Sequence, residues 1–266
     1  MSAEKNQMKQ EIQAAAAAHK QEFEKVSAYI FANPELAFTE VKGQQALCEL
    51  LENNGFAVTR GVGGISTSFE AVYDTGKPGK NIAFMAEYDA LPEIGHACGH
   101  NLMCAIACGA GIGLKSVIDT LGGKITVLGT PAEEENGAKI GMAAQGIFDN
   151  MSLAMMMHSW SGGKCRADMD ALSLRCYFVE FYGQAAHAVA APWEGRSALA
   201  AARKFLDLID ARRECFTPDV HVNSIILDGG KAPNIIPDYV KLSMEFRTAT
   251  MKSMGAVDEM VKKCAD

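Results

Sequence analysis

Short apolar segments alternate with longer helix-type segments through the first 160 residues, and this alternation constrains the fold more than any other feature. The predicted strands are FAVTR, STSFEAVY, NIAFMAEY, KITVLG and LAMMMH. The predicted helices cover the N-terminus to about residue 31, residues 41–53, residues 102–121 and a short stretch near Lys139. Strands that alternate with helices are typical of α/β layering, so we expect a mixed, largely parallel sheet with flanking helices.

The pattern changes after Trp160, where SGGKCRADMD has the composition of a linker. Beyond it we predict a strand, a helix, two strands and a helix. They cover 172–183, 197–212, 220–227, 239–247 and the chain from 251 onward. This βαββα order is one strand short of a ferredoxin-like α+β unit. Two domains are therefore predicted, over residues 1–167 and 168–266.

Composition argues against several classes of protein. There are 32 acidic and 25 basic residues, a net charge of −7, whereas a nucleic-acid partner needs a basic face. No apolar run approaches the roughly 18 residues of a membrane span, and the N-terminus lacks the apolar centre of a signal peptide. The eight cysteines are then expected to be reduced thiols or metal ligands in a cytoplasmic protein without nucleic-acid or membrane partners.

The stretch GHACGHN places two histidines and a cysteine just before a predicted helix. His96, Cys98 and His100 are spaced by two, so they share a side in extended backbone but not on a helix. A common site therefore requires a loop, which Gly95 and Gly99 allow. The helix dipole is expected to lower the pKa of Cys98 toward the metal-binding thiolate. The alternative is a buried loop with one hydrogen-bonded histidine.

Cys104 and Cys108 lie four residues apart on the predicted helix, beside alanines and glycines. They would suit a redox or zinc–thiolate site, but the chain contains no CxxC motif. We therefore interpret them as small residues in a tight contact between helix and sheet.

The stretch GTPAEEENG carries three adjacent glutamates, 133–135, at the C-terminal end of the predicted strand KITVLG. Open α/β sheets form their binding crevices at that end. Adjacent carboxylates raise each other's pKa unless a cation holds them. One of them can then bind metal while its neighbour acts as a general base. The alternative is a solvated acidic turn.

His158 and Asp89 also follow predicted strands. Each has a simpler interpretation, His158 as a core histidine and Asp89 as a turn former before Pro92. Taken with GHACGHN and the glutamates, however, they bring thiolate, imidazole and carboxylate to one sheet edge, and these are the usual zinc ligands. Asp89 would orient a ligand histidine. A metal site is therefore predicted at this edge.

Six stretches, in this order, resemble a family of di-zinc amidohydrolases and carboxypeptidases. They are NPELAFTE, AEYDALPEIGHACGHN, GTPAEEENGAKIGM, MMMHSW, GQAAHAVAAPWEGRSALAA and GGKAPNIIPDYVKLSMEFR. The family includes aminoacylase, hippurate hydrolase, carboxypeptidase G, plant indole-acetyl-amino-acid hydrolases and p-aminobenzoyl-glutamate hydrolase. The likeness covers nearly the whole chain and leans toward the p-aminobenzoyl-glutamate hydrolase and dipeptidase-like branch. It implies a zinc-peptidase-like catalytic domain with an inserted lid and dimerisation domain.

The resemblance also implies roles for single residues of the catalytic domain. The implied metal ligands are Cys98, His100, Glu134 and His158, and they would hold two divalent ions, zinc first, with manganese or cobalt as alternatives. Glu133 matches the general base and Asp89 the aspartate of the preceding motif. The wider family has His-x-Asp there, where this chain has Glu87-Tyr88-Asp89. His96 matches a histidine that is not a ligand.

Three residues of the predicted lid match positions that act on the substrate. His187 is expected to reach the active site of the neighbouring subunit and to polarise the scissile carbonyl. Asn234 and Arg247 are expected to hold the substrate carboxylate, for which arginine offers two parallel donors. A homodimer through the lid follows. Without the resemblance, His187 and Arg247 look like ordinary surface residues.

The expected activity is metal-dependent hydrolysis of the amide bond in N-acyl amino acids or dipeptide-like substrates with a free carboxylate. The alternatives are a hydrolase-fold binding protein without catalysis and, less favoured, a thiol-redox protein. The family's last histidine ligand belongs to a C-terminal return that would lie beyond Asp266. The chain by itself is therefore expected to bind about one metal ion and to show little amidase activity.

Overall fold

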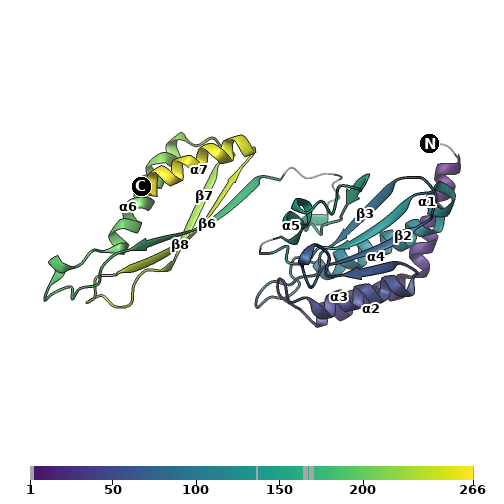
Figure 1. Ribbon diagram of the computed structural model, residues 1–266, viewed down its shortest axis with the longest axis horizontal. Coiled ribbons are helices and arrows are strands. Elements are labelled where there is room, and N and C mark those ends of the chain that lie inside the picture. Colours follow the sequence, from purple (N-terminus) through teal and green to yellow (C-terminus); the bar gives the residue numbers. More distant parts are fainter. Residues whose placement is uncertain (1–2, 136, 164–166, 168–170, 266) are drawn as a thin grey trace. The chain divides into compact units, whose positions relative to one another are not determined.

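The structure is a computed structural model that describes residues 3–135, 137–163, 167 and 171–265 (Figure 1). The chain divides into two compact units, residues 1–165 and residues 166–266, and each has its own sheet. The predicted linker and the predicted boundary between residues 167 and 168 fall largely outside the described residues.

The first unit is built on a five-stranded mixed sheet in the order β1-β2-β4-β3-β5 (Figure 1). Its strands are β1 (Ala57–Arg60), β2 (Phe69–Asp74), β3 (Asn81–Ala86), β4 (Lys124–Gly129) and β5 (Leu153–Met155). Strand β2 pairs antiparallel with β1 and β4, whereas β3 pairs parallel with β4 and β5. The carboxyl ends of β4, β3 and β5 therefore meet at one edge of the sheet, with β3 in the middle.

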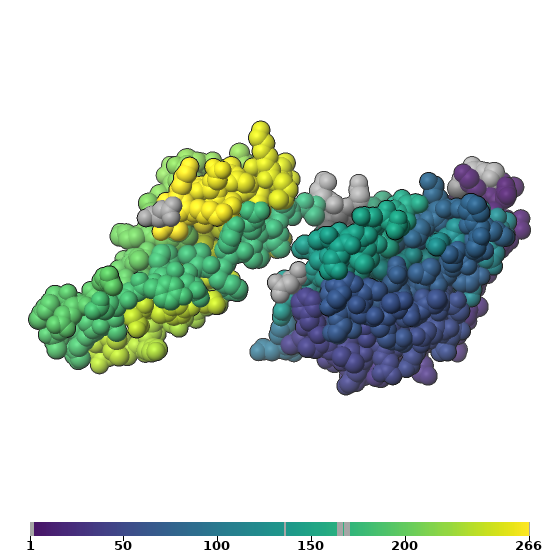
Figure 2. Space-filling view, in the orientation of Figure 1, coloured from purple at the N-terminus to yellow at the C-terminus, as the bar shows by residue number. Residues whose placement is uncertain are grey.

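Helices surround this sheet. They are α1 (Ala3–Ala18), α2 (Lys20–Ala32), α3 (Val41–Asn53), α4 (His100–Leu121) and α5 (Ala138–Ala144). Helix α4 packs on β3 and β4, α3 packs on β1 and β2, and α1 and α2 pack on α4. In the space-filling view, purple and blue atoms of the N-terminal segments form much of the visible face of this unit (Figure 2). The single N-terminal helix that we predicted is two helices, because the chain leaves helical geometry at His19.

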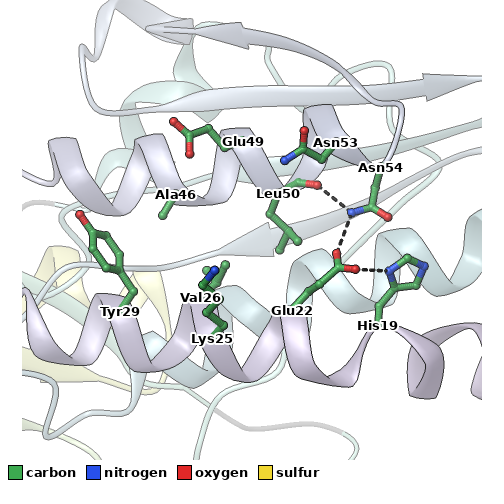
Figure 3. A pocket seen from close by; sticks show the side chains of 10 residues that line it. All are labelled: His19, Glu22, Lys25, Val26, Tyr29, Ala46, Glu49, Leu50, Asn53 and Asn54. Atoms are coloured by element: carbon green, nitrogen blue, oxygen red, sulfur yellow. Dashed lines mark hydrogen bonds and ion pairs between the residues drawn. The ribbon is translucent and has the colours of Figure 1, made fainter.

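A groove runs between α2 and α3 on the surface of the first unit (Figure 3). At one end, Asn54 donates a hydrogen bond from Nδ2 to Glu22 Oε2 (3.4 Å) and another to the carbonyl oxygen of Leu50 (2.9 Å). The other oxygen of Glu22 lies 3.1 Å from Nδ1 of His19. These contacts tie the start of α2 to the end of α3, so the polar groups at this end of the groove are engaged in holding the two helices together.

Small residues allow α4 to approach the sheet closely. Cys104 and Cys108 are fully buried in the main hydrophobic core, together with Leu47 and Phe69. The packing interpretation of these two cysteines is thereby confirmed. Gly111 faces β4 so closely that an added Cβ would lie 2.7 Å from Cγ2 of Val127.

Helix α4 is 22 residues long and is apolar enough, by length and composition alone, to cross a membrane. The expectation that no apolar run approaches such a length was therefore wrong. Of its most apolar window, 67% is buried inside the structure. A core helix covered by a sheet on one side and by α1 and α2 on the other passes the same test of length and composition, so this helix is weak evidence for a membrane span.

The second unit is a three-stranded antiparallel sheet in the order β6-β8-β7, with two helices. Its elements are β6 (Ser173–Tyr182), α6 (Ala198–Arg212), β7 (His221–Asp228), β8 (Tyr239–Thr248) and α7 (Met251–Ala265). The predicted βαββα order is confirmed. Buried side chains of both helices, such as Phe205 and Val257, pack against Leu242 and Phe246 of β8. Along β6 every second residue, Phe178 among them, is exposed on the opposite face.

We predict that Gly111→Ala lowers the free energy of unfolding by about 1–3 kcal/mol, because the new methyl group overpacks the contact between α4 and β4. Gly141→Ala is the matched control, since an added Cβ at this helical position meets nothing within 4 Å. The control should be neutral or stabilise by up to about 1 kcal/mol. Urea denaturation measures both variants, and equal effects of the two would contradict the packing argument.

Candidate metal centre

The predicted ligands of the first unit lie together at the edge where β4, β3 and β5 end. Glu87 and Asp89 follow β3, Glu133 and Glu134 follow β4, His158 follows β5, and Cys98 and His100 lie in the turn before α4 and at its first residue. Among the described residues, two groups have all their ligand atoms within 4.8 Å of one another: Cys98, His100 and His158, and Glu87, His100 and Glu133. The sheet topology thus brings together donors that are up to 71 residues apart in sequence.

The loop before α4 depends on two glycines with positive φ, Gly95 (+66°) and Gly99 (+84°). Side chains are disfavoured in this left-handed region. A Cβ at Gly99 would also lie 2.6 Å from the hydroxyl oxygen of Ser159. Gly99 therefore allows the GHACGHN loop to approach the segment that carries His158. The predicted loop is confirmed, although the helix begins two residues earlier than expected and includes His100.

Asp89 fixes the orientation of the His100 ring. Nδ1 of His100 lies 3.1 Å from Oδ1 of Asp89 and 3.0 Å from its carbonyl oxygen. Both partners are acceptors, so Nδ1 carries a proton and Nε2 presents its lone pair to the site. The other carboxylate oxygen, Oδ2, accepts a hydrogen bond from the backbone N–H of Glu134 (2.9 Å). One buried side chain thus positions a histidine and a glutamate loop.

Burial opposes charge on both members of this pair, but their interaction outweighs it. Burial raises the pKa of Asp89, yet the hydrogen bonds from His100 and from the Glu134 backbone hold the pKa below its ordinary value. Burial lowers the pKa of His100, whereas the hydrogen bond and the charge of Asp89 raise it above its ordinary value. A more basic imidazole is a stronger metal ligand.

His158 is oriented in the same way. Its Nδ1 donates to the carbonyl oxygen of Ser159 (2.7 Å), so Nε2 carries the lone pair in the neutral ring, and it lies 3.7 Å from Sγ of Cys98. The hydroxyl of Ser159 in turn donates to the carbonyl oxygen of Cys98. The segment after β5 and the GHACGHN loop therefore hold each other in place around a sulfur and two imidazole nitrogens.

We predicted a lowered pKa for the Cys98 thiol, and this prediction is wrong when only the protein's own groups act on the sulfur. Burial raises the pKa of this thiol to about 12, and the neighbouring carboxylates of Glu134, Glu133 and Glu87 add to the increase. Full negative charges close to the sulfur outweigh the partial positive charge of a helix start. A metal ion that binds here must therefore displace the thiol proton.

Three buried polar atoms at this edge have no hydrogen-bond partner among the described residues: Glu87 Oε2, His100 Nε2 and Glu134 Oε1. Nε2 of His100 lies 3.5 Å from Glu87 and 3.8 Å from both Glu133 and Glu134. Each unpaired buried polar atom costs about 1–3 kcal/mol, and more when it is charged. A divalent cation would satisfy all three, and sulfur, nitrogen and oxygen are the donors that zinc accepts. The residues therefore fit a divalent metal centre.

Exposure separates the two adjacent glutamates. The side chain of Glu133 is 39% exposed, whereas that of Glu134 is 19% exposed and has a fully buried Oε1. A general base has to reach water, while a ligand is held inside the site. The difference suits Glu133 as the base and Glu134 as the ligand.

Glu87 was not predicted as a donor. Its side chain is only 2% exposed, and its Oε1 accepts a hydrogen bond from Nζ of Lys139. A signal was present in the sequence, because Glu87 follows β3 directly and stands where the wider family has a histidine. Its burial and its distance to His100, however, depend on the three-dimensional structure.

The predicted lid residues all belong to the second unit. Nδ1 of His187 accepts hydrogen bonds from the backbone N–H groups of Val189 (3.2 Å) and Ala190 (3.1 Å). With Nδ1 as the acceptor, the ring proton of His187 lies on Nε2. The carbonyl oxygen of Asn234 accepts a hydrogen bond from Ala188 (2.9 Å), so Asn234 and His187 lie side by side.

Arg247 lies far from that pair within the subunit. It is on β8, eight residues beyond Tyr239, which corresponds to roughly 26 Å of strand. Asn234 precedes Tyr239, and the chain between them pairs with the segment that follows β6. Asn234 therefore lies beyond the Tyr239 end of β8, on the side away from Arg247. Asn234 and Arg247 of one subunit therefore cannot hold the same small carboxylate. Nε of Arg247 donates to Glu245 (2.6 Å).

Comparisons with known proteins agree with this architecture. Residues 173–266 match the peptidase dimerisation domain of the M20 family. A Xaa-Arg dipeptidase from Mus musculus is 35% identical over 251 residues, which cover 90% of this chain and 58% of the relative. A p-aminobenzoyl-glutamate hydrolase chain of Escherichia coli (strain K12) is 30% identical over 269 residues, which cover 94% of this chain and 55% of the relative. The chain thus spans somewhat more than half the length of these relatives.

One solved structure shows the same fold. It is a dinuclear metal-binding peptidase of the M20 family from Bacillus subtilis, with a TM-score of 0.70 and 21% sequence identity. The match covers 94% of this chain and 70% of that chain. It extends through both units described above.

We predict that zinc binds more tightly as the pH rises, because binding displaces the Cys98 proton. With a thiol pKa of about 12, the apparent affinity should increase about tenfold per pH unit between pH 6 and 8. The raised pKa of His100 adds a second competing proton at acid pH, where the dependence should steepen. Calorimetric titration in two buffers of different ionisation enthalpy measures the released protons. In Cys98→Ala, the tenfold increase in zinc affinity per pH unit should disappear. Binding by the unsubstituted chain that does not depend on pH would contradict the argument.

Proposed function

Because this chain belongs to the M20 peptidase family, we propose that the protein is a metal-dependent hydrolase of amide bonds. Its substrates would be N-acyl amino acids or dipeptide-like molecules with a free carboxylate. One observation carries the proposal: buried, unpartnered donor atoms of Glu87, His100 and Glu134 lie at one sheet edge next to the partly exposed Glu133. The named activities of the two relatives support this class of substrate.

Cys98, His100, His158 and Glu134 would hold two divalent ions, zinc first because a thiolate is among the donors, with manganese or cobalt as alternatives. When bound, such ions polarise a carbonyl group and make water acidic enough to lose a proton near neutral pH. Asp89 keeps the proton of His100 on Nδ1, so that Nε2 remains a donor to metal. The backbone of Ser159 does the same for His158.

Glu133 would move the protons of the reaction. Its partly exposed carboxylate is placed to take a proton from the attacking water and to return it to the leaving amine. Glu134 is held back from this role, because its backbone N–H is fixed by Asp89 and its Oε1 is buried. The two glutamates would thus take different roles because Glu134 is buried more deeply than Glu133.

His187 would donate a hydrogen bond to the substrate carbonyl. Two backbone N–H groups hold Nδ1 as the acceptor, so Nε2 carries the proton that an oxyanion needs. Arg247 would bind the substrate carboxylate with the guanidinium donors that Glu245 leaves free. Because Asn234 and His187 lie far from Arg247 along the sheet, we propose that they act on a substrate from different subunits of a homodimer. The match to a dimerisation domain supports this arrangement. The protein would act on small molecules in the cytoplasm.

The test is hydrolysis by the protein expressed from its complete reading frame, with N-acetyl and N-benzoyl amino acids, p-aminobenzoyl-glutamate and dipeptides as substrates. Turnover should vanish with chelator and return with zinc, manganese or cobalt. Glu133→Gln should keep its metal and lose at least about 10²-fold in kcat, since it removes the general base. Glu134→Ala should lose metal. Elemental analysis that finds Glu133→Gln stripped and Glu134→Ala fully loaded would reverse the assignment.

We further predict that His187 acts in trans. In verified heterodimers of a His187→Ala subunit and a Glu133→Gln subunit, one of the two active sites combines an intact Glu133 with an intact His187. The mixture should therefore recover part of the activity that each parent dimer lacks. Homodimers of each variant, assayed at the same concentration, are the controls. Heterodimers without recovered activity would show that His187 serves its own subunit or has no role.

A further inference from the structure

Two glutamates of the NPELAFTE stretch have no part in the proposed reaction, and their surroundings differ. Oε2 of Glu35 accepts hydrogen bonds from the backbone N–H groups of Lys42 (2.8 Å) and Gly43 (3.0 Å), so Glu35 caps the start of α3. Glu40 directly precedes α3, but its side chain makes no capping hydrogen bond and is fully buried. The start of the helix therefore does not account for the burial of the Glu40 carboxyl group.

The Glu40 carboxyl group instead reaches the segment after β4. Its Oε1 accepts a hydrogen bond from the backbone N–H of Ala132 (2.8 Å), although the two residues are 92 positions apart in sequence. Ala132 is fully buried and has a φ of +59°, in the left-handed region that side chains disfavour. Its carbonyl oxygen accepts a hydrogen bond from the N–H of Gly137 (2.8 Å). Both backbone polar groups of Ala132 are thus held, and the disfavoured turn is fixed directly before Glu133.

Burial makes this contact difficult to replace. It raises the pKa of the Glu40 carboxyl group above its ordinary value, while neighbouring donors, the Thr67 hydroxyl and the Ala132 N–H among them, oppose that increase. The other oxygen, Oε2, has no hydrogen bond of standard geometry in the described part of the chain, and neither has the hydroxyl of Thr67. Removal of the Glu40 acceptor would leave the Ala132 N–H buried and unpaired, and this would destabilise the turn.

Two buried carboxyl groups thus hold the backbone on either side of Glu133. Oε1 of Glu40 holds the Ala132 N–H, and Oδ2 of Asp89 holds the Glu134 N–H (2.9 Å). We propose that Glu40 is a positioning residue for Glu133: it keeps the left-handed turn at Ala132 and so fixes where the proton-transferring carboxylate lies. In this role Glu40 acts through the backbone, without contact to substrate or metal. The inference rests on the proposed function of Glu133 as the general base.

Steady-state kinetics of the zinc-loaded protein from its complete reading frame test the proposal. Glu40→Met keeps the length of the side chain but removes the acceptor, so kcat should fall at least about 10-fold through misplacement of Glu133. KM and zinc content should stay within about twofold, because Glu134 keeps its own support from Asp89 and the residues proposed to bind the substrate belong to the second unit. Glu40→Gln retains an oxygen for the Ala132 N–H, so its kcat should stay within about threefold of the unsubstituted value.

Glu35→Met is the matched control, since it removes an acceptor of backbone N–H groups from the same stretch. It should lower the urea midpoint through the lost helix cap and leave kcat within about twofold of the unsubstituted value. A kcat of Glu40→Met equal to that of Glu35→Met would overturn the proposal. So would a kcat of Glu40→Gln as low as that of Glu40→Met, because the acceptor would then not be what matters.

Hydrogen exchange at the Ala132 amide is a second measurement, and it requires no turnover. This amide should exchange at least about 10-fold faster in Glu40→Met than in the unsubstituted protein or in Glu40→Gln. If Glu40→Met does not fold, Glu40→Asp takes its place with the same expected results, because its shorter side chain withdraws the oxygen from the Ala132 N–H. Normal protection of this amide in either variant of an active enzyme would overturn the role of Glu40 alone. A zinc-loaded unsubstituted protein that hydrolyses none of the substrates would instead overturn the proposed function, and with it the kinetic role of Glu40.

Discussion

The buried carboxylate of Asp89 is the contact on which the whole candidate centre depends. It joins the end of β3 to the first residue of α4 through His100, and to the segment after β4 through the Glu134 backbone. Without it, Nδ1 of His100 would keep only the backbone carbonyl oxygen of residue 89 as an acceptor, and the glutamate loop would lose a charged hydrogen bond worth about 1.5–3 kcal/mol. The chemistry of the edge therefore relies on a residue that need not touch metal or substrate. Burial raises the pKa of this carboxyl group, but the hydrogen bonds from His100 and from the Glu134 backbone hold the pKa below its ordinary value and so favour the ionised form.

The topology of the sheet explains why these residues meet. Because β4, β3 and β5 run parallel and adjacent, whatever follows each strand arrives at the same edge. Close packing beneath the edge then sets the depth of each donor. Gly129 ends β4 where an added Cβ would lie 2.2 Å from Phe69 and 2.8 Å from the Tyr88 hydroxyl. This contact lets Tyr88 fill the core between Glu87 and Asp89, while the carboxylates of those two residues lie beside the His100 ring.

Much of this arrangement was predictable, because periodicity identifies strands and the residues after strands identify the edge. The helix at 41–53, the βαββα order and the core role of Cys104 follow from local pattern alone. What failed depended on neighbours distant in sequence. The break at His19 has no glycine or proline to announce it, and the high pKa of Cys98 comes from burial and from carboxylates in two other segments. Glu87 was missed for the same reason, since its position after a strand is only a weak signal until its burial and its distance to His100 are known. The roles of His187, Asn234 and Arg247 came only from resemblance, which carried no information about the length of sheet between them.

Electrostatics couples the metal centre to the fold. Several carboxylates lie close together at this edge, and Lys139 pairs with one of them, Glu87. Burial and the nearby carboxylates raise the pKa of the Cys98 thiol, so the thiol keeps its proton and adds no further negative charge. Divalent ions, if held here, would displace that proton and at the same time satisfy the unpaired atoms of Glu87, His100 and Glu134. The free energy of metal binding would then also stabilise the contacts between the ends of the three strands. A site built in this way need not be rigid before metal arrives, because the ions themselves supply the attraction that the carboxylates lack.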